Sequence, residues 1–152
     1  LVDLYNKTRT EISQPELSDI EEGLWSNDGK YLIFSRKESP TLWLLNSTVK
    51  SVSELALATN LKHTSWTYNN DLVFVTDQAY STINSLEINL LSEKADQSLT
   101  FGAFNPKNNK YNSLGEFPEV QTMPEEFIVT SGGDTIYFKS GDKNFRIILR
   151  KF

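Results

Sequence analysis

The sequence lacks cysteine and contains a single histidine, His63. Without cysteine there are no thiol nucleophiles, thiolate-bound zinc sites or disulfides. A Ser-His-Asp triad would have to use His63, and no serine motif accompanies that residue. The sequence motifs of phosphate-binding loops and of zinc proteases are also missing. We therefore expect a protein that is not an enzyme and that carries no cofactor and no metal site.

Long apolar runs and an excess of positive charge are absent as well. No stretch approaches the roughly 20 apolar residues that cross a bilayer, so we expect no membrane insertion. The net charge of −5 argues against nucleic acid as a partner, because phosphate backbones bind basic surfaces. The sequence does not decide the cellular compartment. An extracytoplasmic setting, in a bacterial envelope or at a cell surface, is favoured because cysteine-free sequences are common there.

What the chain does have is an internal repeat rich in aromatic residues. Residues 23–35 return in altered form at residues 64–76, and Trp25 and Trp66 lie 41 residues apart. A period near forty, built from short β runs joined by Asn, Asp and Gly turns, is typical of the four-stranded sheets of a β-propeller. We therefore expect the two tryptophans at equivalent, largely buried places. A third, weaker copy without tryptophan begins at Phe127.

The predicted fold is all-β, a propeller-like stack of four-stranded antiparallel blades. Continuous apolar runs at 32–34, 42–45 and 72–75 favour strands that are buried on both faces, as in stacked blades. One β domain over 1–152 then divides into five parts. They are the end of one blade at 1–12, a blade at 23–55, a blade at 63–101, an insertion loop at 102–126 and an incomplete blade at 127–152. The third strand of the blade at 63–101 is expected at 83–90.

The first copy resembles a known structural module. Residues 25–30, Trp-Ser-Asn-Asp-Gly-Lys, precede an apolar strand, and residues 42–46, Leu-Trp-Leu-Leu-Asn, form the next strand. These motifs are similar to the TolB-type, WD-repeat-like β-propeller module. The sequence departs from that module at Asn27, where proline is usual. The resemblance implies a propeller fold and leaves the activity open, because propellers serve binding, scaffolding and catalysis alike.

About three copies are fewer than the roughly four to eight blades of a propeller. The chain is therefore a segment of a larger ring, or associates to complete one, or forms an open β arrangement. We expect the segment. Its first residues, 1–4, and its last strand, 145–149, are the likeliest exposed edges, and exposed edges favour association. The expected partner is the remainder of its own propeller, a second copy, another protein, or its own N-terminal strand added to the last sheet.

Candidate ligand-binding residues come from equivalent places in the three copies. Glu22 and His63 each lie three residues before a repeat landmark, and Glu126 precedes the third copy. If all three pointed to one mouth of a central channel, they would form a cation or ligand site; the alternative is that they are solvated loop residues. Glu21 and Glu22 are not expected to form a carboxylate pair, because neighbours on a regular strand point to opposite faces.

The least repeat-like segment is the Asn-rich stretch at 105–112. Loops on rigid β scaffolds often carry recognition, so Asn105, Lys107, Lys110 and Tyr111 are candidate partner-binding residues. The alternative is a floppy insertion without a partner.

Two functions remain in view. The first is a non-catalytic binding or scaffolding propeller segment that mediates protein or ligand interactions in a bacterial envelope or surface protein. The alternative is the accessory propeller of a larger hydrolase of the prolyl-oligopeptidase type.

Overall fold

The computed structural model confirms the all-β class. It describes residues 2–3, 8–9, 11–55, 57, 59–83, 87–93, 99–117, 120, 122–130, 132 and 134–149. Besides strands, these residues form two single-turn 3-10 helices, η1 (Pro15–Leu17) and η2 (Leu61–His63). Among them, no helix is long and apolar enough to cross a membrane.

The first sheet follows the predicted strand order. It contains β3 (Ile20–Trp25), β4 (Tyr31–Arg36), β5 (Trp43–Asn46) and β6 (Ser51–Glu54), each hydrogen-bonded to the next in antiparallel fashion. The β3–β4 turn passes through Gly29 at φ +68°, a conformation that costs glycine nothing because it has no Cβ. The Asn-Asp-Gly signal therefore marks a real hairpin.

The second sheet differs from the expectation in its outer half. It contains β7 (Thr64–Trp66), β8 (Leu72–Thr76), β11 (Leu99–Asn105) and β12 (Lys110–Phe117), in the order β12-β11-β8-β7. The segment expected to supply the third strand instead lies in β9 (Gln78–Ile83) and β10 (Glu87–Glu93), which form a two-stranded antiparallel sheet of their own, with residues 84–86 outside the described residues. The range 102–126, expected to be a long loop or a loop with an extra hairpin, holds the end of β11 and all of β12.

Burial explains why β11 pairs with β8. Phe101 and Phe104 of β11 are fully buried, and the strand pairs with β8 over Thr100 to Phe104. The segment at 83–90 is also apolar, so periodicity in the sequence favours it equally. The choice between the two segments depends on a contact between residues far apart in the chain.

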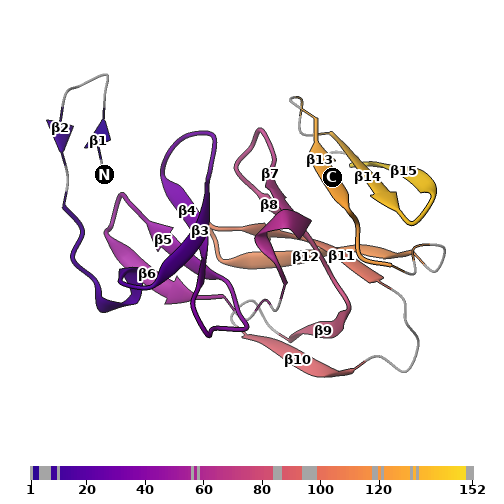
Figure 1. Ribbon diagram of the computed structural model, residues 1–152, viewed down its shortest axis with the longest axis horizontal. Coiled ribbons are helices and arrows are strands. Elements are labelled where there is room, and N and C mark those ends of the chain that lie inside the picture. The colour runs from indigo at the N-terminus through magenta and orange to yellow at the C-terminus, as the bar shows by residue number, and fades with distance from the viewer. Residues whose placement is uncertain are drawn as a thin grey trace.

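The third sheet has three strands. They are β13 (Glu126–Val129), β14 (Thr135–Ser140) and β15 (Lys143–Ile148), in that order. At the other end of the chain, β1 (Val2–Asp3) and β2 (Thr8–Arg9) form a small sheet of their own, well away from β15 (Figure 1). In the described part of the chain the N-terminal strand is therefore not added to the last sheet.

The three sheets stack side by side and bury an apolar layer at each junction (Figure 1). Residues of the first and second sheets, among them Tyr31, Ile33, Phe74 and Phe104, form one cluster. A second cluster joins the second and third sheets. All five residues of β8 are buried, as expected for a strand covered on both faces.

The same hairpin closure recurs in all three sheets. In each sheet, the first strand (β3, β7 or β13) is followed by a residue with a side-chain hydroxyl. The backbone N–H of that residue donates to a backbone carbonyl on the other side of the turn. The three pairs are Ser26 to Tyr31 at 2.8 Å, Thr67 to Asp71 at 2.8 Å and Thr130 to Thr135 at 2.9 Å. The third copy therefore shares the geometry of the other two although it lacks the tryptophan.

The two tryptophans occupy equivalent places but differ in burial. Trp66 pairs with Leu72 and is 7% exposed, whereas Trp25 pairs with Leu32 and is 40% exposed. The prediction that both are largely buried is correct for Trp66 and wrong for Trp25. Trp66 packs against the first sheet, and no sheet covers Trp25 in the described structure.

Candidate functional site

A cavity of about 690 Å³ lies where the first sheet meets the segment that leads into the second sheet. Polar side chains from four places line it: the start of β3, the end of β4, the connection between β4 and β5, and the turn before η2. They include Glu21, Glu22, Ser35, Arg36, Thr59 and Asn60. The cavity therefore combines two acidic groups, one basic group and several neutral polar groups.

A β-bulge places both acidic residues on this cavity. Ile20 pairs with Arg36 and Glu22 pairs with Ser35, which leaves Glu21 as an extra residue between two consecutive partners. An extra residue breaks the alternation of a strand, so neighbouring side chains no longer point to opposite faces. The expectation that Glu21 and Glu22 lie on opposite faces is therefore wrong.

Arg36 is held at the cavity by its aromatic and acidic neighbours. Its guanidinium carbon lies 4.7 Å from the centre of the Trp43 ring, and its Nη2 lies 3.9 Å from a carboxylate oxygen of Asp19. The Trp43 indole in turn donates to the Ser39 hydroxyl at 3.2 Å. The Arg36 Nε is buried and has no hydrogen-bond partner in the described structure. This guanidinium is therefore positioned with one donor unused.

The three predicted ligand residues lie on β3, η2 and β13, in different surroundings. Glu22 lines the cavity, whereas Glu126 is exposed on β13, opposite Lys139. Nowhere in the described ranges do three His, Asp or Glu side chains approach closely enough to hold a metal ion. Sequence reasoning missed Glu21 as a site residue, because a regular strand would point its side chain away from that of Glu22.

His63 has a structural position rather than the solvated one considered for it. It is buried in η2 near the backbone of Pro124, just before β13, and its Nδ1 has no hydrogen-bond partner in the described structure. Burial and the neighbouring Lys62 lower the pKa of His63, and the Pro124 backbone and Asp77 oppose this shift only in part. The imidazole is therefore a neutral link between the second and third sheets.

The predicted partner-binding stretch is an ordered turn between β11 and β12. The side chain of Asn105 accepts the backbone N–H of Lys107 at 2.9 Å, and that of Asn108 accepts the N–H of Lys110 at 3.1 Å. Such side-chain bonds stabilise a turn. These bonds favour a defined turn over a floppy insertion.

Tyr111 belongs to the core rather than to this turn surface. Its ring lies 4.5 Å from that of Phe104 and 6.4 Å from that of Phe74, measured between ring centres. Burial raises the pKa of its phenol. Tyr111 therefore does not lie on the expected partner surface. Lys107 and Lys110 do lie on the exposed turn.

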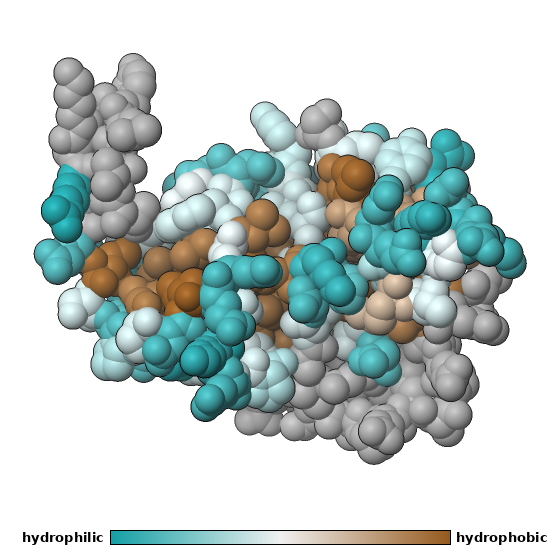
Figure 2. Space-filling view, in the orientation of Figure 1, coloured by the Kyte–Doolittle hydropathy of each residue, from teal (hydrophilic) through white to brown (hydrophobic). Residues whose placement is uncertain are grey.

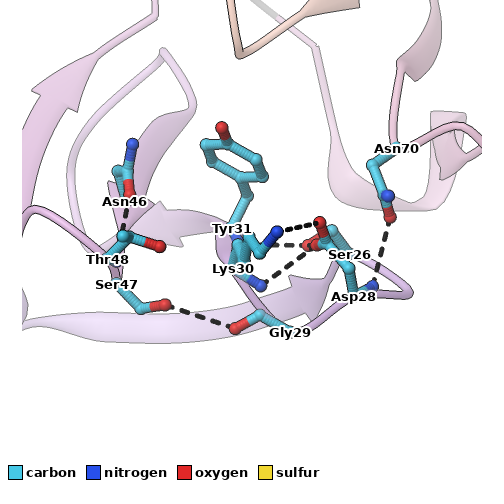
Figure 3. Close-up of polar contacts among 9 residues, drawn as sticks. All are labelled: Ser26, Asp28, Gly29, Lys30, Tyr31, Asn46, Ser47, Thr48 and Asn70. Atoms are coloured by element: carbon cyan, nitrogen blue, oxygen red, sulfur yellow. Dashed lines mark hydrogen bonds and ion pairs between the residues drawn. The ribbon is translucent and has the colours of Figure 1, made fainter.

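The residues that carry the family resemblance form a structural network (Figure 3). The Asp28 carboxylate accepts the Ser26 hydroxyl at 2.8 Å and the Lys30 backbone N–H at 3.1 Å. Burial raises the pKa of Asp28, but these hydrogen bonds and the Lys30 charge outweigh it and lower the pKa. Asp28 is therefore an ionised turn residue.

The same turn also links the first sheet to the second. The Asn27 side-chain amide donates to the Thr67 carbonyl at 2.9 Å. The Asp28 N–H donates to the Asn70 side chain at 3.2 Å, as Figure 3 shows. Asn27 stands where the module usually has proline, and proline could not donate this hydrogen bond. The departure from the module thus adds a contact between sheets.

Comparison with known proteins supports the architecture. No protein-family model matches the chain, and no curated protein matches it. Among solved structures, Porphyromonas gingivalis dipeptidyl peptidase 4 is similar at 11% identity and a TM-score of 0.55, over 82% of this chain and 22% of that one. Oligogalacturonate lyase, solved in complex with manganese, is similar at 15% identity and a TM-score of 0.58, over 93% of this chain and 35% of that one.

Both proteins contain a β-propeller, and at such identities the likeness concerns the fold alone. This chain spans about a fifth of the first and about a third of the second. The stacked sheets, the repeated hairpin closure and these two neighbours together give the chain the fold of a β-propeller segment.

Proposed function

We propose that the chain is a non-catalytic binding segment of a β-propeller, and that the cavity at Glu21 and Glu22 holds a small polar ligand with a cationic group. The bulge in β3 is the observation that carries the proposal. It brings two adjacent acidic residues to the lining of one cavity, where a cation could bind both. Charge-assisted hydrogen bonds from an amine to carboxylates are among the stronger polar contacts in proteins.

The positioned guanidinium of Arg36 supports selectivity. A ligand that carries an acceptor next to its amine would meet Arg36 as well as the carboxylates, whereas a simple metal ion would meet only the carboxylates. Thr59 is fixed beside the cavity because its hydroxyl donates to the Val75 carbonyl at 2.7 Å. Rigid strands therefore hold the polar groups in place before a ligand arrives.

Glycinamide is a direct probe of this site, since it has a free amine beside an amide. Its binding can be followed by chemical-shift changes at Glu21, Glu22 and Arg36, with N-acetylglycinamide as the uncharged counterpart. We expect shifts only with the free amine. The double variant Glu21→Gln/Glu22→Gln should weaken binding at least about tenfold, a loss of roughly 1.4 kcal/mol. Glu126→Gln, another exposed strand carboxylate, is the matched control and should change nothing.

Equal binding of the acetylated probe, or unchanged binding by the double variant, would contradict the proposed amine site.

The envelope or surface setting remains a prediction, as does the alternative of a hydrolase accessory domain. The complete reading frame around this segment separates the two functions. A continuation into an α/β-hydrolase region with a nucleophile elbow would favour the hydrolase.

A further inference from the structure

A second cavity, of about 710 Å³, lies between the second and third sheets. The second sheet contributes the β7–β8 turn and the middle of β8, β11 and β12 to its lining. The third sheet contributes the turn before β14 and the end of β15. This cavity shares no lining residue with the one at Glu21 and Glu22, so the two are separate sites.

One wall of this second cavity is aliphatic. Val73 pairs with Ala103, and Ala103 pairs with Asn112, so these three side chains form one row on the same face of the second sheet. Ile147 and Leu149 of the third sheet also line the cavity and are only partly buried against the second apolar cluster. In the view of Figure 2, apolar residues reach the surface in the region of the third sheet, next to hydrophilic ones. The wall therefore offers aliphatic surface that the core covers only in part.

Two aspartates also line the cavity, one from each sheet. Asp71 is held by its turn, because its backbone N–H donates to the Thr67 hydroxyl at 3.1 Å and its carbonyl accepts the Thr67 N–H at 2.8 Å. The Asp134 carboxylate accepts the hydroxyls of Thr130 and Thr135 at 2.9 and 3.2 Å. Each acidic residue is thus fixed by its own hairpin turn.

The Asp71 carboxylate lacks a full set of hydrogen-bond donors. Its Oδ1 is buried and has no hydrogen-bond partner within the described residues. Burial raises the pKa of Asp71, and a hydrogen bond with Asn105 and the charge of Lys107 oppose this shift only in part. A buried acceptor without a donor is costly. The last torsion of an aspartate side chain is broad, so this oxygen can turn to a donor that enters the cavity.

We propose that this cavity binds a primary amine on a short aliphatic chain, with the ammonium group at Asp71 and Asp134 and the chain against the aliphatic wall. An ammonium group brings three N–H donors, and its hydrogen bonds to carboxylates are charge-assisted. The chain has no polar atom that would be left unpaired against Val73, Ala103 and Ile147. A polyol of the same size would leave hydroxyl groups without partners at that wall, and the two carboxylates would repel an anion.

n-Butylamine is the direct probe of this cavity, and n-butanol is its uncharged counterpart. Binding can be followed by chemical-shift changes at Asp71, Ala103 and Asp134. We expect these shifts with butylamine and none with butanol at the same concentration. Ethylamine should bind at least about tenfold more weakly, because it is two methylene groups shorter and each buried methylene contributes roughly fourfold to affinity.

Two variants test the charge and the wall separately. Asp71→Asn should weaken butylamine binding at least about tenfold, because it removes one of the two charges that face the ammonium group. Asp142→Asn changes an exposed carboxylate on the β14–β15 turn and is the matched control, which should bind butylamine as the wild type does. Ala103→Leu should abolish binding without a change in charge, because the larger side chain occupies the space of the ligand chain. Circular dichroism verifies that each variant keeps its strand content.

The inference does not depend on the amine site at Glu21 and Glu22. The double variant Glu21→Gln/Glu22→Gln should leave the butylamine shifts at Asp71 unchanged, and Asp71→Asn should leave the glycinamide shifts at Glu21 and Glu22 unchanged. A failure of one site is therefore told apart from a failure of the other. Equal shifts with butanol, equal affinity for ethylamine, or unchanged butylamine binding in both Asp71→Asn and Ala103→Leu would overturn the proposal.

Discussion

Trp25 and Trp66 are the same residue of the same repeat in two different surroundings. Each ends the inner strand of its sheet, and each is followed by a hydroxyl residue that closes the hairpin. Trp66 has a sheet beside it and is buried, whereas Trp25 has none in the described structure and is 40% exposed. The motif therefore sets the position and direction of the side chain. Its contribution to stability depends on the neighbouring sheet.

The largest expected effect comes from truncating the two tryptophans. Trp66→Ala should lower the free energy of unfolding by about 3–5 kcal/mol, because it empties a core position. Trp25→Ala should cost only about 1–2 kcal/mol in the monomer, since less apolar surface is buried there. Urea denaturation at concentrations too low for association measures both. Equal losses would break the comparison. Trp66→Phe tests the hydrogen bond separately. It removes the bond from the indole to the Leu24 carbonyl and should lower the free energy of unfolding by about 1 kcal/mol.

His63 tests the junction between the second and third sheets. His63→Ala should cost about 1–3 kcal/mol, because it empties a buried position between η2 and β13. The alternative considered for His63, a solvated loop residue, would predict no loss of stability. An unaltered denaturation midpoint would restore that view.

The pH dependence follows from the lowered pKa of His63. Above the pKa of about 6.5 that His63 has in the unfolded chain, its imidazole is neutral in both the folded and the unfolded state. In this range the free energy of unfolding does not change with pH through His63. Below it the unfolded chain binds a proton that the folded chain resists, so the stability falls as the pH falls. His63 is the only histidine, so His63→Ala should flatten the denaturation midpoint between about pH 7 and 5.5. A slope that persists in the variant would assign it to other groups.

The smallest expected effect concerns the turn that links the first sheet to the second. Asn27→Ala removes the amide bond to the Thr67 carbonyl and should cost about 0.5–1.5 kcal/mol. Asn69→Ala, in the facing turn, removes no hydrogen bond of the described structure and should be near neutral. A loss of the same size in both variants would mean that turn propensity matters and the contact between sheets does not.

The inner strands were predictable from the sequence because their signals are local. The apolar run of β4 and the Asn-Asp-Gly turn before it place the first hairpin, and Leu72 to Thr76 repeats it. The bulge at Glu21 was not predictable in this way. It depends on how β3 aligns with β4, and no residue type at that position demands it.

The sequence by itself determined a sheet-forming chain, the period of its repeat, the hairpin turns and the exclusion of thiol chemistry. These follow from residue type and spacing, which act over a few neighbouring residues. Only the tertiary structure decided that β11 rather than the segment at 83–90 joins β8, that His63 is buried and Tyr111 packs against the core, and that Glu21 joins Glu22 at one cavity. Each of these depends on contacts between residues far apart in the chain, where packing selects among segments of similar local preference.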